Sequence, residues 1–355
     1  MVLLERELKA KGYRKYIEFA ALCLLAAALV WLFGRNLDWR EVGHSLSTAD
    51  PLRLMLAIVL ISLLYLVRAC RWGALLKPLT PARLSDLFVA TTIGFGAVFL
   101  IGRAAEVVRP VALPMRDPRV SPSAAIVTIF VERIYDIMGV AMLFAINLLW
   151  FRPPESLAAY YGRIRAFGFG ILIVLFLGIG FLIWFRQNSA QSIATLNRLF
   201  SRWHFFPQRL AQLIVRLLEQ LSGALRVLVN VAELAETTAW TAALWLGVAC
   251  ANLLVLRAFH VDLGFSGTIF VLGWSMVGSV VPTPGGAAGA FHAATAAGLI
   301  FLGIHKETAA ALSIVLHLVD FGPALLFGLF YFIRGDLSIS RLRTMISPAS
   351  AEANS

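Results

Sequence analysis

The chain of 355 residues is 59% hydrophobic and only 14% charged, whereas soluble domains are about half apolar and about a quarter charged. This composition excludes an ordinary soluble domain and indicates an integral membrane protein. Its formal net charge of +11 comes from 31 lysines and arginines against 20 acids. We interpret this excess as basic loops on one face of a bilayer, in preference to a surface that binds nucleic acid.

Six apolar stretches are long enough to cross a membrane as helices, which takes about 20 residues. They cover residues 16–34, 52–67, 123–150, 166–185, 237–256 and 308–333. The first is too long for the core of a signal peptide, so we expect it to be retained. Arg68 and Arg71 follow the second stretch, and we expect both to face the lipid phosphates.

Two further apolar segments are interrupted and predict re-entrant hairpins. Residues 85–101 run into residues 103–119, which carry arginines, acids and prolines and are too polar to cross. Residues 264–303 are broken at a turn. Proline removes backbone donors and glycine tolerates unusual dihedral angles, which suits the five residues of that turn: Pro282, Thr283, Pro284, Gly285 and Gly286.

The two halves are joined by a less apolar segment, residues 191–233. Between positions 210 and 228 leucine and isoleucine recur at helical spacing with arginines off that stripe, which predicts a basic amphipathic helix. It lies either on the membrane surface or against the protein's own cytosolic face. We predict one polytopic membrane domain over residues 1–336 and a polar tail over residues 337–355.

Ionisable residues inside the third predicted span form the strongest candidate site. Glu132, Arg133 and Asp136 lie in an otherwise apolar run, where a charge is costly and by default marks a function. On a helix Glu132 and Asp136 share a face, and Arg133 is close enough to Asp136 to pair with it. The alternative is an ion pair that merely positions helices. Arg133 is the only basic residue that this topology leaves inside the membrane.

The halves, residues 52–150 and 237–333, resemble each other at a constant offset. Positions 184 apart carry matching or similar residues in four cases: Gly94 and Gly278, Gly102 and Gly286, Arg133 and His317, Asp136 and Asp320. Most lysines and arginines fall on one side if both termini are cytoplasmic. In that topology the two hairpins enter from opposite sides, so the repeat is inverted and predicts a site near the midplane.

At these residues the chain resembles the flippase-like transmembrane domain of the lysylphosphatidylglycerol synthases, over residues 57–331. The resemblance is carried by three groups of residues: Gly102, Arg103, Glu106 and Arg109; Glu132, Arg133 and Asp136; and the turn of residues 282–286 with Gly289. It implies an all-α polytopic helix bundle that moves lipids. Because the chain ends soon after its last predicted span, we expect the stand-alone form without an aminoacyl-transferase domain.

Three positions depart from the family pattern. Ile101 and Ala105 stand where the family tends to have proline and glycine, and His292 stands where it tends to have glutamate. The histidine makes an acidic role after the second turn doubtful and places a pH-sensitive group there instead.

The function expected from these features is transport of a lipid across the inner membrane. Arg103, Arg109 and Arg133 would bind a phosphate or another anionic headgroup. The counter-charges and neighbouring groups would come from Glu106, Glu132, Asp136, His317 and Asp320. Expected partners are a membrane phospholipid or other polar lipid and a separate lipid-modifying enzyme, with no nucleic acid.

Two other functions remain open from the sequence. One is a membrane-embedded enzyme acting on a lipid-linked substrate, with a buried acid or histidine as acid or base. The other is an accessory subunit without transport activity. No phosphate-binding loop and no spacing typical of metal ligands is present, so we expect no cofactor and no metal, and a protein that is not an enzyme.

Overall fold

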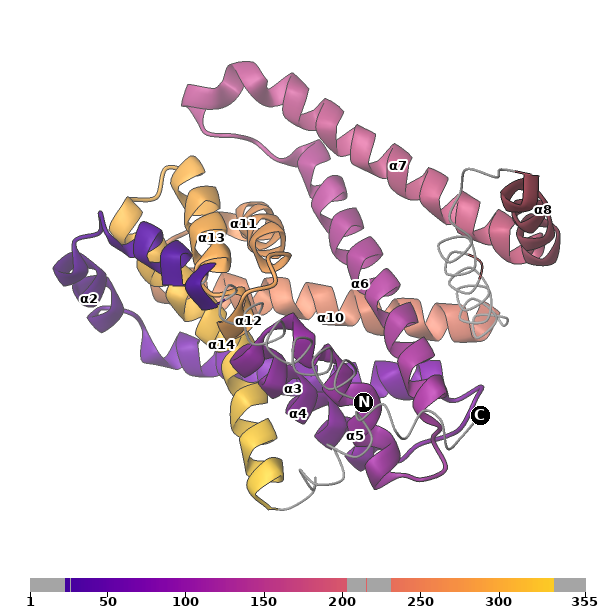
Figure 1. The fold of residues 1–355 in the computed structure, drawn as a ribbon. Helices are drawn as coiled ribbons and strands as arrows, with labels where there is room; N and C mark the ends of the chain where they lie inside the picture. Colours follow the sequence, from indigo (N-terminus) through magenta and orange to yellow (C-terminus); the bar gives the residue numbers. More distant parts are fainter. Residues whose placement is uncertain (1–22, 26, 203–214, 216–230, 335–355) are drawn as a thin grey trace, which may run out of the picture.

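The structure is a computed structural model that describes residues 23–25, 27–202, 215 and 231–334 (Figure 1). The described residues form helices and connecting turns, and none of them lies in a strand. The prediction of an all-α polytopic membrane protein is therefore confirmed. The predicted amphipathic helix of residues 210–228 lies outside the described residues except for residue 215, as do the tail and the start of the first predicted span.

The described chain contains the following elements in order: α2 (Trp39–Ser47), α3 (Pro51–Leu76), α4 (Leu84–Ile101), η1 (Arg103–Val107), α5 (Val108–Arg116), α6 (Pro122–Trp150), η2 (Glu155–Tyr160), α7 (Tyr161–Gln187), α8 (Ser189–Arg202), α10 (Val231–Ala258), α11 (Gly264–Ser279), α12 (Pro284–Ala287), α13 (Ala290–Phe301) and α14 (Lys306–Ile333). Local sequence explains two of the starts. Asp50 and Ser121 accept hydrogen bonds from the first backbone amides of α3 and α6, and a proline follows each cap.

Five helices of the described chain are long and apolar enough to cross a membrane: Pro51–Leu76, Leu84–Ile101, Ala158–Phe181, Ala232–Ala258 and Lys306–Ile333. The 29-residue α6 is not among them. Because α4 is by itself long enough to cross the membrane, helix length does not show that residues 85–119 form a hairpin. Helices α11 and α13, of 16 and 12 residues, are each too short to span. The re-entrant hairpins stay a prediction.

Helix packing relates the two halves of the chain. Helices α3 and α10, the first of each half, pack side by side (Figure 1). Helix α4 packs on α14, the last helix of the second half, and α11 packs on α6, the last of the first. Each contact thus has a counterpart when the halves are exchanged. An inverted repeat stays a prediction that superposition of the two halves will test.

The two glycine turns meet in the structure. Gly102 has φ +89°, and a Cβ at this position would lie 2.9 Å from the carbonyl oxygen of Thr283. Gly286 has φ +62°, and a Cβ there would lie 3.1 Å from Nε2 of His317. Both positions need glycine, because other residues rarely adopt these dihedral angles and have no room here.

The connection between α5 and α6 contains an ion pair outside the helices. Arg119 donates from Nε and Nη2 to the two oxygens of Asp117, at 2.8 and 2.7 Å. These hydrogen bonds hold the pKa of the buried Asp117 carboxyl below its usual value of 3.8. A lowered folded-state pKa stabilises the fold above the unfolded-state pKa, and that contribution is lost as the pH falls through the folded-state value.

We therefore expect Asp117→Asn to lower the free energy of unfolding at pH 7 by about 1 kcal/mol, a charged hydrogen bond discounted because Arg119 is largely exposed. At a pH well below 3.8 the two proteins should be equally stable. Unfolding of both proteins at the two pH values measures this. A difference that does not depend on pH would assign the loss to packing instead of charge.

Candidate functional site

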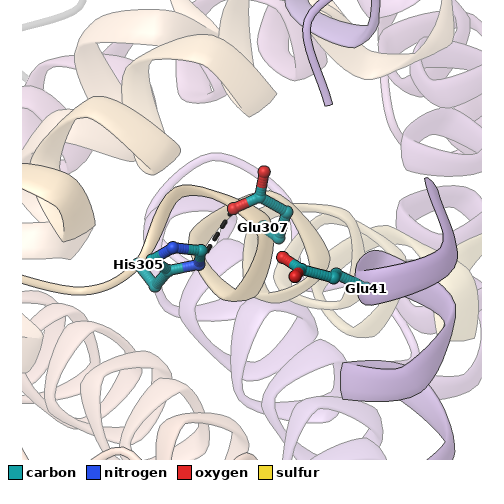
Figure 2. Close-up of side chains that lie close together, drawn as sticks. All are labelled: Glu41, His305 and Glu307. Atoms are coloured by element: carbon teal, nitrogen blue, oxygen red, sulfur yellow. Dashed lines mark ion pairs between the residues drawn. The ribbon is translucent and has the colours of Figure 1, made fainter. Parts of the chain in front are cut away.

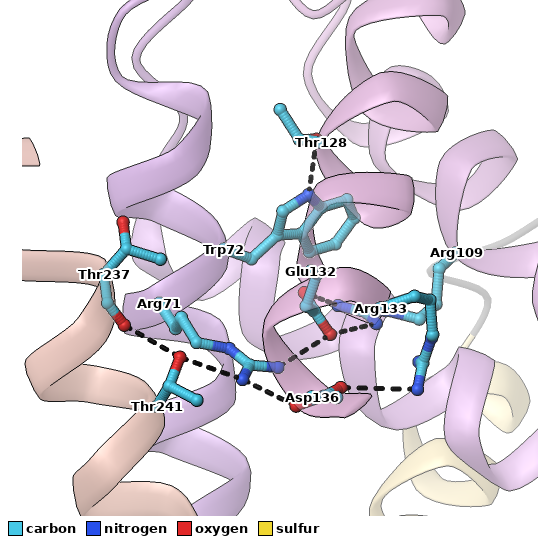
Figure 3. Close-up of polar contacts among 9 residues, drawn as sticks. All are labelled: Arg71, Trp72, Arg109, Thr128, Glu132, Arg133, Asp136, Thr237 and Thr241. Carbon is cyan, nitrogen blue, oxygen red and sulfur yellow. Dashed lines mark hydrogen bonds and ion pairs between the residues drawn. The ribbon is translucent and has the colours of Figure 1, made fainter. Parts of the chain in front are cut away.

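Two carboxylates on one face of α6 are held by arginines from two other helices (Figure 3). Arg109 of α5 forms a bidentate pair with Glu132, with distances of 2.8 and 3.0 Å. Arg71 of α3 contacts both acids, lying 3.2 Å from Oε1 of Glu132 and 2.7 Å from Oδ1 of Asp136. Arg133 contacts the other oxygen of Asp136 at 3.4 Å. We call these five residues the arginine cluster.

Neighbouring side chains orient the arginine cluster. Nη1 of Arg71 also lies 3.4 Å from the hydroxyl of Thr241, which itself donates to the carbonyl of Thr237 on α10. The guanidinium of Arg109 lies over the ring of Trp72, 4.6 Å from its centre. The indole of Trp72 donates to the hydroxyl of Thr128 at 3.0 Å. Helices α3, α5, α6 and α10 therefore all contribute to the position of the buried charges.

Burial divides the arginine cluster into a fixed part and an edge. The side chains of Arg71 and Glu132 are fully buried, and Arg109 is 2% exposed. The side chain of Arg133 is 29% exposed, and its single carboxylate contact is the longest of the set. Three guanidinium groups face two carboxylates, which leaves one positive charge in excess. The excess is best assigned to Arg133, since the other two arginines are held by short contacts.

A second group of charges borders the arginine cluster through Phe95 of α4. The guanidinium groups of Arg68, Arg109 and Arg133 all lie over this ring, 4.8, 5.1 and 5.6 Å from its centre. Arg68 also lines a cavity of about 80 Å³ together with Asp320 of α14. One carboxylate oxygen of Asp320 is buried without a hydrogen-bond partner. An arginine without a close carboxylate and an unsatisfied carboxylate therefore face the same small space.

The structure brings together four of the predicted site residues: Arg109, Glu132, Arg133 and Asp136. Glu106 lies in η1 and is half-buried. Arg103 begins η1, and its side chain lies outside the described part of the chain.

The predicted histidines form a separate aromatic group below the second turn. Nε2 of His317 lies 3.0 Å from the carbonyl oxygen of Gly286. The rings of His317 and His292 are perpendicular, with centres 4.9 Å apart. The predicted repeat pairs His317 with Arg133. In the structure, however, His317 lies at the second glycine turn and not beside the carboxylates of α6.

Two expectations about arginines are wrong. Arg71 does not face the lipid phosphates, because α3 continues to Leu76 and carries this residue into the interior, where both acids of α6 neutralise it. Arg133 is consequently not the only basic residue among the buried charges. The sequence does contain a signal that points to Arg71. Two acids inside a span need basic partners from another helix, and Arg71 follows a neighbouring span.

An apolar groove of about 610 Å³ runs along the other end of α6. Its lining comes from α6, η2, α7, α11 and α13, and includes Phe144, Phe167, Phe270 and Trp274. Phe144 lies eight residues along α6 from Asp136, which corresponds to about 12 Å of helix. The groove is therefore on the same helix as the charges but separate from them.

Fold and site together define a polytopic helical membrane protein with a buried cluster of charges between its spans. The family model of the lysylphosphatidylglycerol synthase TM region matches residues 19–328. The chain therefore belongs to this family, and the resemblance inferred from its motifs is confirmed. No match was found among curated proteins.

Proposed function

We propose that the protein moves a lipid with an anionic, phosphate-bearing headgroup across the inner membrane, with both termini in the cytoplasm and without changing the lipid chemically. The observation that carries the proposal is the uncompensated guanidinium group at the edge of the arginine cluster. Arg133 has one carboxylate contact of 3.4 Å and is partly exposed. A phosphate would supply the missing charge and accept two hydrogen bonds from the planar guanidinium group.

Arg68 supports the same assignment. Its guanidinium group lies against Phe95, as that of Arg133 does, and no carboxylate lies within ion-pair distance of it among the described residues. Two guanidinium groups that share one aromatic ring can bind one phosphate between them. Arg71 and Arg109, which are committed to Glu132 and Asp136, would hold the helices that carry the binding residues.

The apolar groove supports a lipid substrate. A phospholipid places its acyl chains next to its phosphate, and the groove begins about 12 Å along α6 from the arginine cluster. Its aromatic and aliphatic lining would receive a chain, while the polar headgroup remains at the guanidinium groups. A soluble anion has no acyl chain, so it would occupy the guanidinium groups and leave the groove empty.

Reconstitution into vesicles tests the proposal. We expect a fluorescent phosphatidylglycerol placed in the inner leaflet to become accessible to an external quencher faster in protein-containing vesicles than in empty ones, and to be recovered unchanged by mass spectrometry. A chemically altered lipid would favour the membrane-embedded enzyme. A lipid that neither moves nor changes would favour an accessory subunit, whose partner would be a separate lipid-modifying enzyme.

A further inference from the structure

A group of metal-ligating side chains lies away from the arginine cluster, where α2 meets the start of α14 (Figure 2). Glu41 belongs to the first turn of α2, His305 caps α14, and Glu307 lies in the first turn of α14. One ligand atom from each residue lies within 4.8 Å of those of the other two. The three side chains converge on one space from two helices.

The strongest indication of a ligand is the carboxylate of Glu307. Its side chain is 4% exposed, although acidic side chains are almost never buried unless they are paired. Oε2 lies 2.9 Å from Nδ1 of His305 but has no hydrogen-bond partner. The other oxygen, Oε1, lies 3.1 Å from the ammonium group of Lys306. One oxygen of a buried carboxylate is therefore unsatisfied and faces a histidine and a second carboxylate.

We propose that Glu41, His305 and Glu307 form a binding site for a zinc-type divalent cation that ties α2 to α14. Imidazole and carboxylate ligands suit zinc, whereas calcium and magnesium take oxygen ligands. With zinc–ligand distances of about 2.0 to 2.2 Å, tetrahedral ligand atoms lie about 3.3 Å apart. The ligand atoms now lie within 4.8 Å of one another, so the side chains would have to close to that spacing on binding. Three protein ligands leave the fourth position to water.

The charge around the group also favours a cation. Two carboxylates and one neutral imidazole carry a charge of −2, and Lys306 offsets part of it through Oε1 of Glu307. The ammonium group of Lys306 also donates to the carbonyl oxygen of Asn36, which holds it on the far oxygen of Glu307. A divalent cation between the ligand atoms would complete the neutralisation and bind the lone pair of the neutral imidazole, whose one proton would then lie on the other ring nitrogen.

The site would act on the fold instead of on the lipid. Helix α14 carries His317 and Asp320 in its middle, and α2 packs on α14. A metal bound only by the folded chain stabilises the folded state in proportion to its occupancy. Binding would therefore raise the unfolding midpoint without any requirement for lipid.

Titration of the full-length, chelator-treated protein in detergent with zinc chloride tests the proposal. We expect one zinc ion per chain and a rise in the unfolding midpoint. Removal of a residue that hydrogen-bonds to a metal ligand typically weakens metal affinity by about 10 to 100-fold, so loss of a direct ligand in Glu41→Gln or His305→Gln should weaken it at least about tenfold. Both residues are exposed, so both variants should fold. Each is compared with its own unfolding midpoint in the absence of zinc, because His305 also lies 2.9 Å from Oε2 of Glu307.

His44→Gln is the matched control, because His44 is an exposed histidine on the same α2 helix, and it should bind zinc as the unaltered protein does. The proposal is overturned if the unaltered protein binds no zinc, or if both ligand variants bind it with unchanged affinity. It is also overturned if magnesium chloride stabilises the protein as much as zinc chloride does, since the histidine would then have no part. None of these readouts depends on lipid movement, so they are independent of the proposed transport function.

Discussion

Arg71→Met is expected to destabilise the fold by about 3 to 5 kcal/mol, the largest effect of any single substitution proposed here. The substitution removes a fully buried guanidinium group that contacts both Glu132 and Asp136. Glu132 keeps its bidentate partner Arg109, but Asp136 retains only the 3.4 Å contact with Arg133. A buried carboxylate without a close partner costs more than the lost ion pair contributed. Chemical unfolding in detergent measures the effect.

The second substitution Asp136→Asn should recover most of that loss in the Arg71→Met background, because it removes the stranded charge. The two single variants and the double variant form a double-mutant cycle that isolates the interaction between the two residues. Arg53→Met, on the same helix, is the control. Arg53 is partly exposed, lies 3.4 Å from Asp50 and donates to the carbonyl oxygen of Arg257 at 2.8 Å, so its loss should cost about 1 kcal/mol. Equal costs for Arg71→Met and Arg53→Met would contradict the assigned burial.

Arg133→Gln is expected to slow lipid movement at least about tenfold while the protein folds normally. A charge-assisted hydrogen bond to phosphate contributes about 1.5 to 3 kcal/mol, and about 1.4 kcal/mol corresponds to a factor of ten. The fold should tolerate the change because the side chain is partly exposed and has a single long contact. Arg133→Lys should also be impaired, because an ammonium group cannot form the planar bidentate contact. The vesicle assay described above measures both variants.

Arg165→Gln is the matched control, since this arginine is exposed on α7 and contacts only the ring of Tyr161 among the interactions described. It should move lipid at the unaltered rate. Normal transport by folded Arg133→Gln would contradict the role of Arg133 and direct the search for the anion site to Arg68. Neutralising Glu132, Arg133 and Asp136 together, which the sequence alone suggests as a test, would strand Arg71 and Arg109, because their partners would be lost.

Much of the fold is predictable from the sequence because the lipid environment imposes simple rules. A stretch of about 20 apolar residues in a membrane protein forms a helix, since its backbone hydrogen bonds must be satisfied internally. The predicted stretches 123–150 and 308–333 accordingly agree with α6 and α14 within two residues at each end. The shared face of Glu132 and Asp136 is likewise a consequence of helical periodicity.

The contact between the glycine turns agrees with the predicted repeat, which pairs Gly102 with Gly286 and predicts a common site near the midplane. Their proximity is visible in the structure through Gly102 and the carbonyl oxygen of Thr283. The lengths of the helices were less predictable. The apolar run of α3 stops at residue 67, but the helix continues to Leu76, since its last turns are stabilised by buried partners instead of by lipid.

The amino-acid sequence is enough to identify a helical membrane protein of this family, with two acids on one face of a span and a family motif that contains Arg109. Which arginines neutralise those acids depends on how the helices pack. An arginine near the end of an apolar run can extend to the lipid phosphates or turn inward, and Arg71 turns inward because α6 presents carboxylates to it. The same holds for Glu41 and His305, which are far apart in the chain and meet only where α2 packs on α14. Local sequence decides which residues form a helix and which of them share a face. The charge that a side chain contacts depends on the neighbouring helix, and packing determines which helix that is.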